Sequence, residues 1–502
     1  MVFRGRMTTW AMLGTCMALI LLSVLTMPWW TVDDAFISYR YGQNLLYHGK
    51  LTWNPAEPEL VEGYTGILLP LLTALILKIG LPVTHTVKVI GLLSALGTVA
   101  WLRRGLQGLG APNAVQWIGC LLLGLSPLLT MHALSGLETS LFAFFISGAW
   151  VLAAADSKPN SRLAAFLLGL LLLMGGLCRP EGIAFAGLML MGLGWKRMRG
   201  DSRPRSKSKA IEAALAFAAL IGYWLWRWWY YGNPLPNSYH AKAYDGILNP
   251  DSFWAMAKFA GYYVAIPAAG AILISLKQKR PIFSSVIAND PTKLVSILFL
   301  VIVMVTYLDS NLWMNYGSRF FFPFLPIVLL LLASAISWNS TPKISGWMKA
   351  VLIVLGIGQL GIMGFRQIQE RVFLRYYDRI VQEELIPVGK VLKNSSPPIH
   401  RVASYMDAGA LGFYSDATVI DFGRLSDTYL AQSKPSTQEV VEYFYSQSPE
   451  ALVITSWIED GIEYTDEAMA IVRDPRFKAY QFIRTWGNSA GFAYWQRLYL
   501  KQ

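Results

Sequence analysis

The sequence predicts a polytopic α-helical membrane protein with a small α/β domain at its carboxyl end. Hydrophobic residues make up 54% of the 502-residue chain and charged residues only 15%, whereas soluble proteins carry about 25% charged residues. The mean hydropathy is +0.40. Several apolar runs are long enough, or nearly so, to cross about 30 Å of hydrocarbon. After residue 364 the apolar content falls and the charge rises, which indicates a second domain.

The net charge of +12 follows the pattern of a membrane protein rather than that of a nucleic-acid-binding protein. Basic residues crowd into short loops between apolar runs, above all in residues 196–209, as the positive-inside rule describes for cytoplasmic loops. We therefore expect no nucleic-acid partner. Cys16, Cys120 and Cys178 all lie in apolar runs, so no disulfide framework is expected.

The first apolar run, residues 7–30, predicts an uncleaved signal anchor. Arg4 and Arg6 precede it, which places the amino terminus in the cytoplasm. The run is longer than a typical signal core, and no clear cleavage site precedes Asp33. The protein is therefore expected in the inner (plasma) membrane as a multi-pass protein.

The next apolar stretch, residues 67–79, is short and contains Pro70 and Lys78. If it crossed the membrane, the basic loop at residues 196–209 would lie outside, so we expect an amphipathic helix along the outer interface instead. With the first run, this gives about eleven crossings. The later ones are residues 86–102, 114–131, 137–155 and 163–177, a segment between Gly182 and Lys196, residues 210–229, 253–276 and 294–308, a segment between Arg319 and Lys343, and residues 347–364.

The remainder, residues 365–502, is expected on the periplasmic or extracytoplasmic side, next to a transmembrane domain of residues 1–364. Short buried runs predict strands, and one polar segment predicts a helix. The expected elements are strands at 401–405, 418–422 and 451–455, a helix at 438–445 and a hairpin within 480–500.

An acidic pair, Asp33 and Asp34, directly follows the first apolar run. An Asp at the bilayer centre would cost about 2.5–3.5 kcal/mol, so this pair is expected at the aqueous interface. The pair begins a predicted helix, for which a single Asp suffices as the N-cap. The other carboxylate is then available to accept a proton from a substrate hydroxyl, with Arg40 about two turns further on. The sequence leaves open which of the two is the base.

Other acids and one base recur in the predicted outer loops. Glu62 precedes a Gly-aromatic turn, and Glu138 lies in the loop between the third and fourth crossings. Arg179 and Glu181 form an Arg-Pro-Glu-Gly motif, which is also compatible with a simple interfacial ion pair. For Glu62, a role in the site and a role as a solvated loop acid both stay open.

Cations suited to phosphate occur in two further outer loops. A proline-rich loop ends in Asn237, Tyr239, His240 and Lys242, and Arg319 stands before three phenylalanines at the start of a later helix. Lysine binds phosphate as a point charge, histidine can donate to phosphate or carry a proton, and arginine matches phosphate oxygens bidentately. Snorkelling of the lysine to the interface is the structural alternative.

Motifs for nucleotides and metals are missing from the sequence. There is no Walker loop, no dinucleotide fingerprint and no zinc-ligand spacing, and the five histidines form no cluster with cysteine. No cofactor and no metal site is therefore predicted, and nothing in the residues supports a divalent cation. A nucleotide-sugar donor at the inner face is likewise unsupported.

The chain resembles the GT-C glycosyltransferases, polytopic enzymes that take sugars from polyprenyl-phosphate carriers at the outer face. It looks most similar to the group that contains the terminal arabinofuranosyltransferase of mycobacterial cell walls, although that enzyme has a longer chain and tail. The similar motifs are Asp33-Asp34-Ala-Phe-Ile-Ser-Tyr-Arg40, Val61-Glu62-Gly63-Tyr64-Thr65, Ser135-Gly-Leu-Glu138-Thr, Arg179-Pro-Glu181-Gly, Gly232-Asn-Pro-Leu-Pro-Asn-Ser-Tyr-His-Ala-Lys242 and Asp407-Ala-Gly-Ala-Leu-Gly-Phe-Tyr414.

The resemblance implies that Asp33 or Asp34 is a catalytic base and that an interfacial helix follows the first outer loop. We expect inverting transfer of a pentose or hexose from a polyprenyl phosphate to a hydroxyl of an envelope glycan, lipid or protein. The phosphate is expected at Lys242, His240, Arg319 and Arg179. Supporting roles are expected for Arg40, Glu62, Glu138, Glu181, Asn237 and Tyr239.

Two other functions stay open at this point. A transporter or flippase for a lipid-linked sugar or polyol would use the same polar outer mouth, but it needs polar groups deep in the helices, most of which are apolar. A non-catalytic envelope scaffold would bind polymer through the tail. Membrane lipid is an expected partner in every case. The tail is expected either to help bind the acceptor or to cap the outer loops, and the oligomeric state is open.

Overall fold

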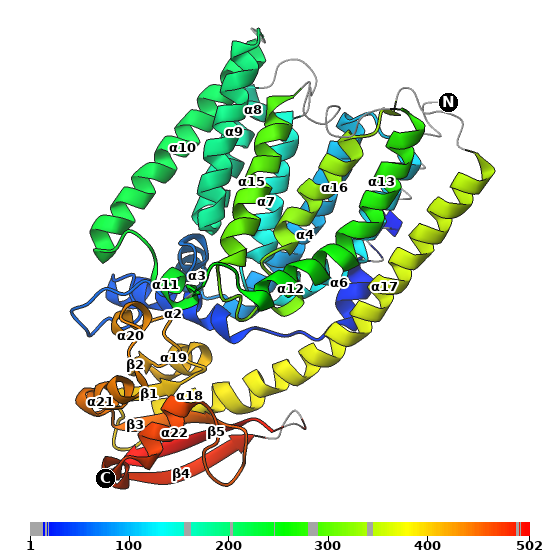
Figure 1. Ribbon diagram of the computed structural model, residues 1–502. Coiled ribbons are helices and arrows are strands. Elements are labelled where there is room, and N and C mark those ends of the chain that lie inside the picture. Colours follow the sequence, from blue (N-terminus) through cyan, green and yellow to red (C-terminus); the bar gives the residue numbers. More distant parts are fainter. Residues whose placement is uncertain are drawn as a thin grey trace.

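A computed structural model describes residues 14–15, 18, 20–154, 162–200, 204–244, 246–279, 290–338, 345–487, 491 and 493–502. The chain forms a long helical bundle with a small α/β domain at one end (Figure 1). The predicted first crossing, residues 7–30, lies partly outside the described residues; within it, residues 20–26 are helical.

The bundle helices occupy the positions of the ten crossings expected after the first. They are α4 (Val83–Gly108), α5 (Asn113–Gly124), α6 (Pro127–Leu134), α7 (Thr139–Ala154), α8 (Arg162–Cys178), α9 (Pro180–Met198), α10 (Pro204–Tyr231), α12 (Pro250–Phe259), α13 (Ala265–Lys277), α15 (Pro291–Leu308), α16 (Leu325–Ser334) and α17 (Gly346–Arg379). Among the described residues, six helices are long and apolar enough to cross a membrane, or seven if α5 and α6, bent by 50°, form one span. The total of about eleven crossings stays a prediction.

Two helices cross the end of the bundle that faces the carboxyl-terminal domain, namely α2 (Asp33–His48) and α3 (Leu68–Lys78) (Figure 1). They pack so closely that a Cβ on Gly42 would lie 2.6 Å from the carbonyl oxygen of Pro70. With 11 residues, α3 is too short to span the hydrocarbon. Its position along the outer interface stays a prediction.

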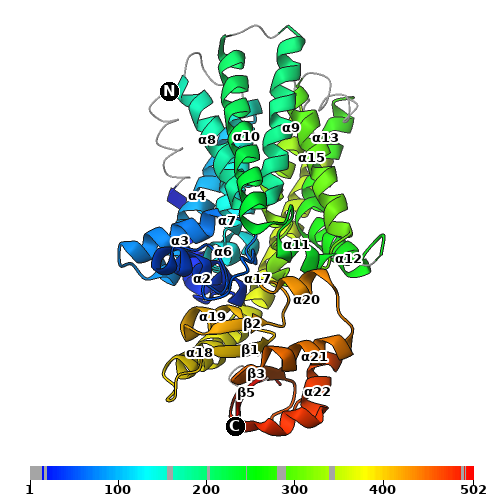
Figure 2. The same ribbon diagram turned by 90° about the vertical axis from the view of Figure 1, so that its left-hand side faces the viewer.

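The two ends of the bundle differ in charge. Lys196 and Arg197 lie in the last turn of α9, far from α2, whereas Asp33 and Asp34 begin α2 beside the carboxyl-terminal domain. Figure 2 shows α2, α11 (Asn237–Lys242) and α12 together at the domain end. This separation is the one that the charge pattern predicts; which side of the membrane each end faces stays a prediction.

The carboxyl-terminal domain contains one five-stranded sheet with the strand order β2-β1-β3-β5-β4. The parallel pairs are β1–β2 and β1–β3, and β5 pairs antiparallel with β3 and β4. The strands are β1 (Arg401–Tyr405), β2 (Thr418–Asp421), β3 (Ala451–Ser456), β4 (Tyr480–Gly487) and β5 (Trp495–Lys501), and the helices are α19 (Gly409–Ser415), α20 (Thr428–Gln432), α21 (Thr437–Gln447) and α22 (Asp466–Arg473).

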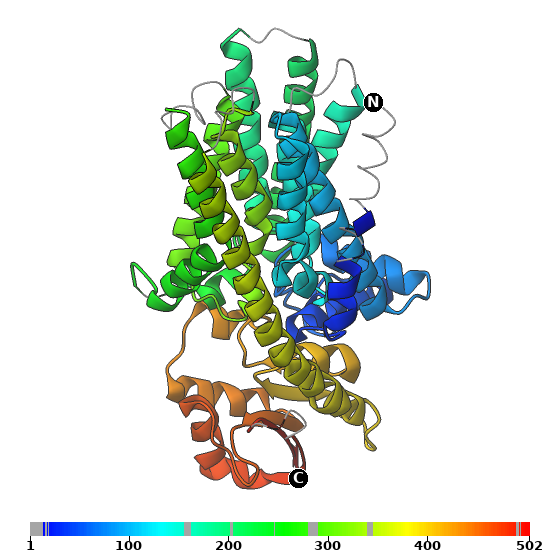
Figure 3. The ribbon, with the colours of Figure 1, turned by 90° about the vertical axis from the view of Figure 1, so that its right-hand side faces the viewer.

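A single helical segment connects the bundle to this domain. Helix α17 continues through a π-helical turn, Ile380–Leu385, into α18 (Ile386–Lys393), giving 48 helical residues from Gly346 (Figure 3). The segment passes without a break through residue 364, where the sequence places the domain boundary. That boundary therefore falls inside a helix, and the division of the chain into two domains stays a prediction.

The domain docks on α2 through a buried arginine. Arg40 donates hydrogen bonds to the carbonyl oxygens of Trp53 (2.8 Å) and Ala417 (2.7 Å) and also to that of Gly412. Its guanidinium lies 4.5 Å from the ring centroid of Trp53. Because these carbonyls belong to both parts of the chain, Arg40 ties the segment that follows α2 to α19.

Candidate active site

The acidic pair at the start of α2 divides into two environments. Asp33 is only 3% exposed, and its two carboxylate oxygens accept hydrogen bonds from the backbone N–H groups of Gly409 (2.9 Å) and Ala410 (2.8 Å). Burial, reinforced by the charge of Asp407, raises the pKa of Asp33 well above its ordinary value. Asp33 thus holds the amino end of α19 against the bundle.

Asp34 is turned toward a different set of groups. Its Oδ2 accepts a hydrogen bond from Nη1 of Arg319 at 3.0 Å, and its side chain is 15% exposed. Among the described residues, none donates a hydrogen bond to its other oxygen, Oδ1. Asp34 is therefore the member of the pair with an oxygen available to a ligand.

Lys242 lines three cavities at this end of the bundle. The acidic cavity, about 140 Å³, is bounded by Asp33, Asp34, Asp407 and Asp421. The polar notch, only about 20 Å³, lies against Asp34, Glu138 and Arg319. The apolar cavity, about 330 Å³, lies between α9, α11 and α15 and is faced by residues such as Ala184, Leu235, Ile302, Leu312 and Phe320.

The ammonium group of Lys242 lies among aromatic and cationic neighbours. Its Nζ is 5.2 Å from the ring centroid of Phe320. Burial, with a smaller effect from the charge of Arg319, lowers the pKa of Lys242 to about 8. An anion bound beside it would favour the charged form and reverse part of this shift.

A buried ion pair stands behind the polar notch. Nε of Arg179 donates to Oε1 of Glu138 at 3.0 Å, and the two side chains are 1% and 6% exposed. Burial alone would raise the pKa of Glu138, but the charges of Arg179 and Arg319 hold it below its ordinary value.

Arg179 and the nearby Arg319 have guanidinium nitrogens that this ion pair does not use. Nη1 and Nη2 of Arg179 and Nε of Arg319 are buried and have no hydrogen-bond partner among the described residues. Such groups cost about 1–3 kcal/mol each when unsatisfied, which makes this region favourable for an anion.

Other predicted site residues have partners within the protein. Glu62 forms a buried ion pair with Arg227 of α10, with Nε to Oε2 at 2.8 Å. Glu181, on the apolar cavity, accepts a hydrogen bond from the hydroxyl of Tyr307. Asn237 accepts a hydrogen bond from Gln432 of α20 at 3.1 Å, so it links α11 to the carboxyl-terminal domain.

The two remaining predicted residues lie at the edge of the site. Tyr239 is 51% exposed and lines the apolar cavity. His240 lines none of the three cavities described above, and its ring lies 5.7 Å from that of Tyr239. Burial lowers the pKa of His240, which favours its neutral form.

Three residues near the site were not assigned a role from the sequence. Asp407 lines the acidic cavity although it belongs to the carboxyl-terminal domain. Nε2 of His132 lies 2.8 Å from the carbonyl oxygen of Gly317, in the turn that leads to Arg319. The hydroxyl of Tyr377 accepts a hydrogen bond from the backbone N–H of Asp33 at 3.1 Å. Two sequence signals could have pointed to them: His132 lies inside an apolar helix, and Asp407 begins the motif that ends at Tyr414.

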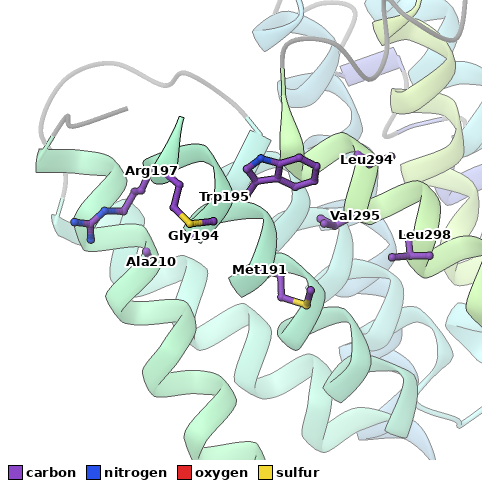
Figure 4. A pocket seen from close by; sticks show the side chains of 9 residues that line it. Met191, Gly194, Trp195, Arg197, Ala210, Leu294, Val295 and Leu298 are labelled. Carbon is purple, nitrogen blue, oxygen red and sulfur yellow. The ribbon is translucent and has the colours of Figure 1, made fainter. Parts of the chain in front are cut away.

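A larger cavity, about 820 Å³, lies at the opposite ends of α9 and α15 (Figure 4). Its lining includes Met191, Trp195, Ala210 and Leu298, with Arg197 as the charged member. Because no carboxylate among the described residues lines it, the described part of this cavity offers no acid–base pair. Among the described residues, no group of three or more His, Cys, Asp or Glu side chains is placed to hold a metal ion.

Comparisons with known proteins agree with the architecture. Residues 358–499 match a family model described as a domain of unknown function, DUF8728. A comparison with curated protein sequences found no match. Among solved structures, the archaeal oligosaccharyltransferase AglB from Archaeoglobus fulgidus, in complex with an inhibitory peptide and a dolichol-phosphate, has a TM-score of 0.60 at 11% identity, covering 97% of this chain and 74% of that chain.

Two further solved structures are similar. ArnT from Cupriavidus metallidurans, bound to undecaprenyl phosphate, has a TM-score of 0.58 at 10% identity, covering 98% of both chains. The arabinofuranosyltransferase AftD from Mycobacteria has a TM-score of 0.55 at 12% identity; the match covers 97% of this chain and 40% of that chain. The chain therefore has the GT-C fold of a multi-pass membrane protein, which confirms the fold class predicted from its sequence.

Proposed function

We propose that this protein is a membrane glycosyltransferase that moves a sugar from a polyprenyl-phosphate carrier to an acceptor hydroxyl. The observation that carries the proposal is the position of Lys242, where an apolar cavity, unsatisfied arginine nitrogens and an available carboxylate meet. The similar structures contain a dolichol-phosphate and undecaprenyl phosphate, which supports a lipid-phosphate donor.

The apolar cavity suits the isoprenoid tail of such a donor. Ile302, Leu312 and Phe320 present hydrocarbon to it, and Lys242 stands at its polar end. The phosphate then meets Lys242 and Arg319 in charge-assisted hydrogen bonds, and the buried charge of Arg179, which lines none of the three cavities, adds to the attraction for the anion. These cations stabilise the negative charge that develops on the leaving phosphate.

Asp34, rather than Asp33, is the general base in this proposal. Both oxygens of Asp33 are already bound by Gly409 and Ala410, whereas Oδ1 of Asp34 has no protein donor among the described residues. Asp34 takes the proton of the acceptor hydroxyl while that oxygen bonds to the anomeric carbon. The bond from the anomeric carbon to the phosphate oxygen breaks, its electron pair stays on the phosphate, and the single displacement inverts the carbon.

The acceptor is a glycan, lipid or protein hydroxyl on the outer face of the inner (plasma) membrane, with the amino terminus in the cytoplasm. A transporter or flippase would use the same cavities without forming a covalent product. Comparing polyprenyl-phosphate sugars and envelope glycans, by mass spectrometry, in cells with and without this chain tests the difference. Accumulation of one lipid-linked sugar in the deleted cells identifies the donor, whereas unchanged glycans contradict the proposal.

A direct test uses the purified chain in nanodiscs with that lipid-linked sugar. Asp34→Asn is expected to reduce transfer by about 10²–10⁴. Asp309→Asn changes an exposed aspartate at the same end of the bundle and is expected to leave transfer unchanged. Undiminished transfer by Asp34→Asn, by Asp33→Asn and by the double variant would remove the assignment of the base to this pair.

A further inference from the structure

The carboxyl-terminal domain contributes a carboxylate to the same cavity as Asp34. Asp407 follows β1 and lines the acidic cavity opposite the start of α2, together with Asp421 at the end of β2. Trp313 and Met314, in the connection after α15, line the same cavity, and the Trp313 side chain is 56% exposed. The cavity is thus walled by acids from two parts of the chain and by one aromatic ring.

Asp407 is held from two directions. Its Oδ2 accepts hydrogen bonds from the hydroxyl of Tyr494 and from Nε2 of Gln496 (3.3 Å), both at β5 or just before it. Two residues further along, Gly409 is bound by the Asp33 carboxylate, and a Cβ there would lie 2.1 Å from the Asp33 carbonyl oxygen. The backbone around Asp407 is therefore fixed against α2, and the carboxylate is fixed against the sheet.

Negative charge is disfavoured in this cavity, in contrast to the region around the arginines. Burial and the charge of Asp34 raise the pKa of Asp407, and burial raises the pKa of Asp421 to about 7. The cation that faces the cavity is Lys242, on the side shared with the apolar cavity. An anion is therefore stabilised on the side of Lys242 and Arg319, whereas an anion placed between Asp34 and Asp407 lies against two carboxyl groups and is disfavoured.

The size of the cavity limits what it holds. Its volume of about 140 Å³ is well below the roughly 300–1,000 Å³ of pockets for drug-sized ligands. A single small ring with its hydroxyl groups matches so small a space.

We infer that the acidic cavity is the acceptor subsite and that it takes a neutral, hydroxyl-rich sugar ring. Asp407 accepts a hydrogen bond from one hydroxyl of that ring, the Trp313 indole packs on its apolar face, and Asp34 receives the proton of the reacting hydroxyl. This inference rests on the proposed function, and it excludes sugars that carry a carboxylate or phosphate on the ring that enters the cavity.

The test uses the full-length chain in nanodiscs and saturation-transfer NMR with methyl glycosides. The neutral probes are the methyl glycosides of glucose, galactose, mannose and arabinofuranose, and the anionic probes are the methyl glycosides of glucuronic and galacturonic acid. At least one neutral probe is expected to bind, and both uronides are expected not to. Binding of a uronide as tight as that of its neutral counterpart, or binding of no neutral probe, would overturn the inference.

Variants separate the role of Asp407 from a general loss of structure. Asp407→Asn is expected to lower the affinity for the neutral glycoside by about 10- to 100-fold, the usual effect of losing a hydrogen bond to a charged group. Asp416→Asn is the matched control. Asp416 is an exposed residue of the same domain, and asparagine tolerates the left-handed backbone conformation found there. Equal glycoside affinity in wild type and Asp407→Asn contradicts the inference.

Binding of undecaprenyl phosphate in the same samples distinguishes the two proposals. The wild type and Asp407→Asn are expected to bind it equally, because Asp407 does not line the apolar cavity. If the wild type binds no undecaprenyl phosphate, the proposed function fails regardless of the glycoside results. If undecaprenyl phosphate binds but no neutral glycoside does, or a uronide binds as tightly as its neutral counterpart, only the inference about the acceptor subsite is wrong.

Discussion

The contrast between Asp33 and Asp34 gives the sharpest prediction, because the same chemical change at two adjacent residues has opposite consequences. In Asp33→Asn, the amide can accept a hydrogen bond from only one of the two N–H groups of Gly409 and Ala410. The other buried N–H then faces an NH₂ group and loses its partner. In Asp34→Asn, the contact with the carboxyl-terminal domain is unchanged, whereas the proton acceptor is removed and the ion pair with Arg319 loses its negative partner.

The magnitudes follow from these contacts. An unsatisfied buried N–H costs about 1–3 kcal/mol, which corresponds to about 5- to 150-fold in an opening equilibrium. We therefore expect amide hydrogen exchange of residues 409 and 410 to accelerate by that factor in Asp33→Asn and to stay at the wild-type rate in Asp34→Asn. Transfer is expected to fall by about 10²–10⁴ in Asp34→Asn.

Hydrogen exchange read by mass spectrometry, on peptides that cover α19, measures the first effect. Peptides of α22 serve as the internal reference, because that helix packs on α21 and should exchange equally in both variants. The reverse pattern would refute the reasoning. That pattern is loss of transfer with unchanged α19 protection in Asp33→Asn, together with normal transfer and faster α19 exchange in Asp34→Asn.

Three further predictions address the surrounding structure. Glu62→Gln leaves Arg227 as a buried, unpaired charge and should destabilise the protein by about 3–5 kcal/mol in thermal unfolding. The double variant with Arg227→Gln should recover part of this loss. A double variant no more stable than Glu62→Gln would contradict the pairing. Lys242 is charged only below its pKa of about 8, so the affinity for undecaprenyl phosphate should fall as the pH rises through 8. Lys242→Arg should move this loss to higher pH. Calorimetric titrations that find no pH dependence in the wild type would contradict the role of the lysine. Ile302→Trp fills the apolar cavity and should weaken undecaprenyl phosphate binding at least about tenfold, whereas Val305→Trp, on the same helix but outside that cavity, should not; equal effects of the two would show that the cavity is not the tail site.

Local patterns were sufficient for much of the fold. The strands predicted at 401–405 and 451–455 agree with β1 and β3 to within one residue, because short runs of buried residues between turns define a strand by themselves. The predicted domain boundary at residue 364 does not coincide with the end of a helix. Composition changes there, but residues 365–386 contain no Gly or Pro that would end the helix, so α17 continues.

The candidate site required contacts that no local pattern contains. The predicted topology placed Lys242, Arg319 and Asp34 in loops at the same end of the bundle, and the three line one cavity. The difference between Asp33 and Asp34 depends on N–H groups 376 residues further along the chain. Glu62 likewise has its partner in Arg227, 165 residues away.

The uninterrupted segment from Gly346 to Lys393 also limits how the molecule can move. At 1.5 Å per residue its 48 residues span roughly 70 Å, more than twice the roughly 30 Å of the hydrocarbon layer. A rod of this length transmits tilt and rotation from the lipid-embedded part to the sheet. The carboxyl-terminal domain is therefore coupled to the bundle by a continuous helix rather than by a flexible linker, and a tilt of α17 would reposition the sheet as a whole.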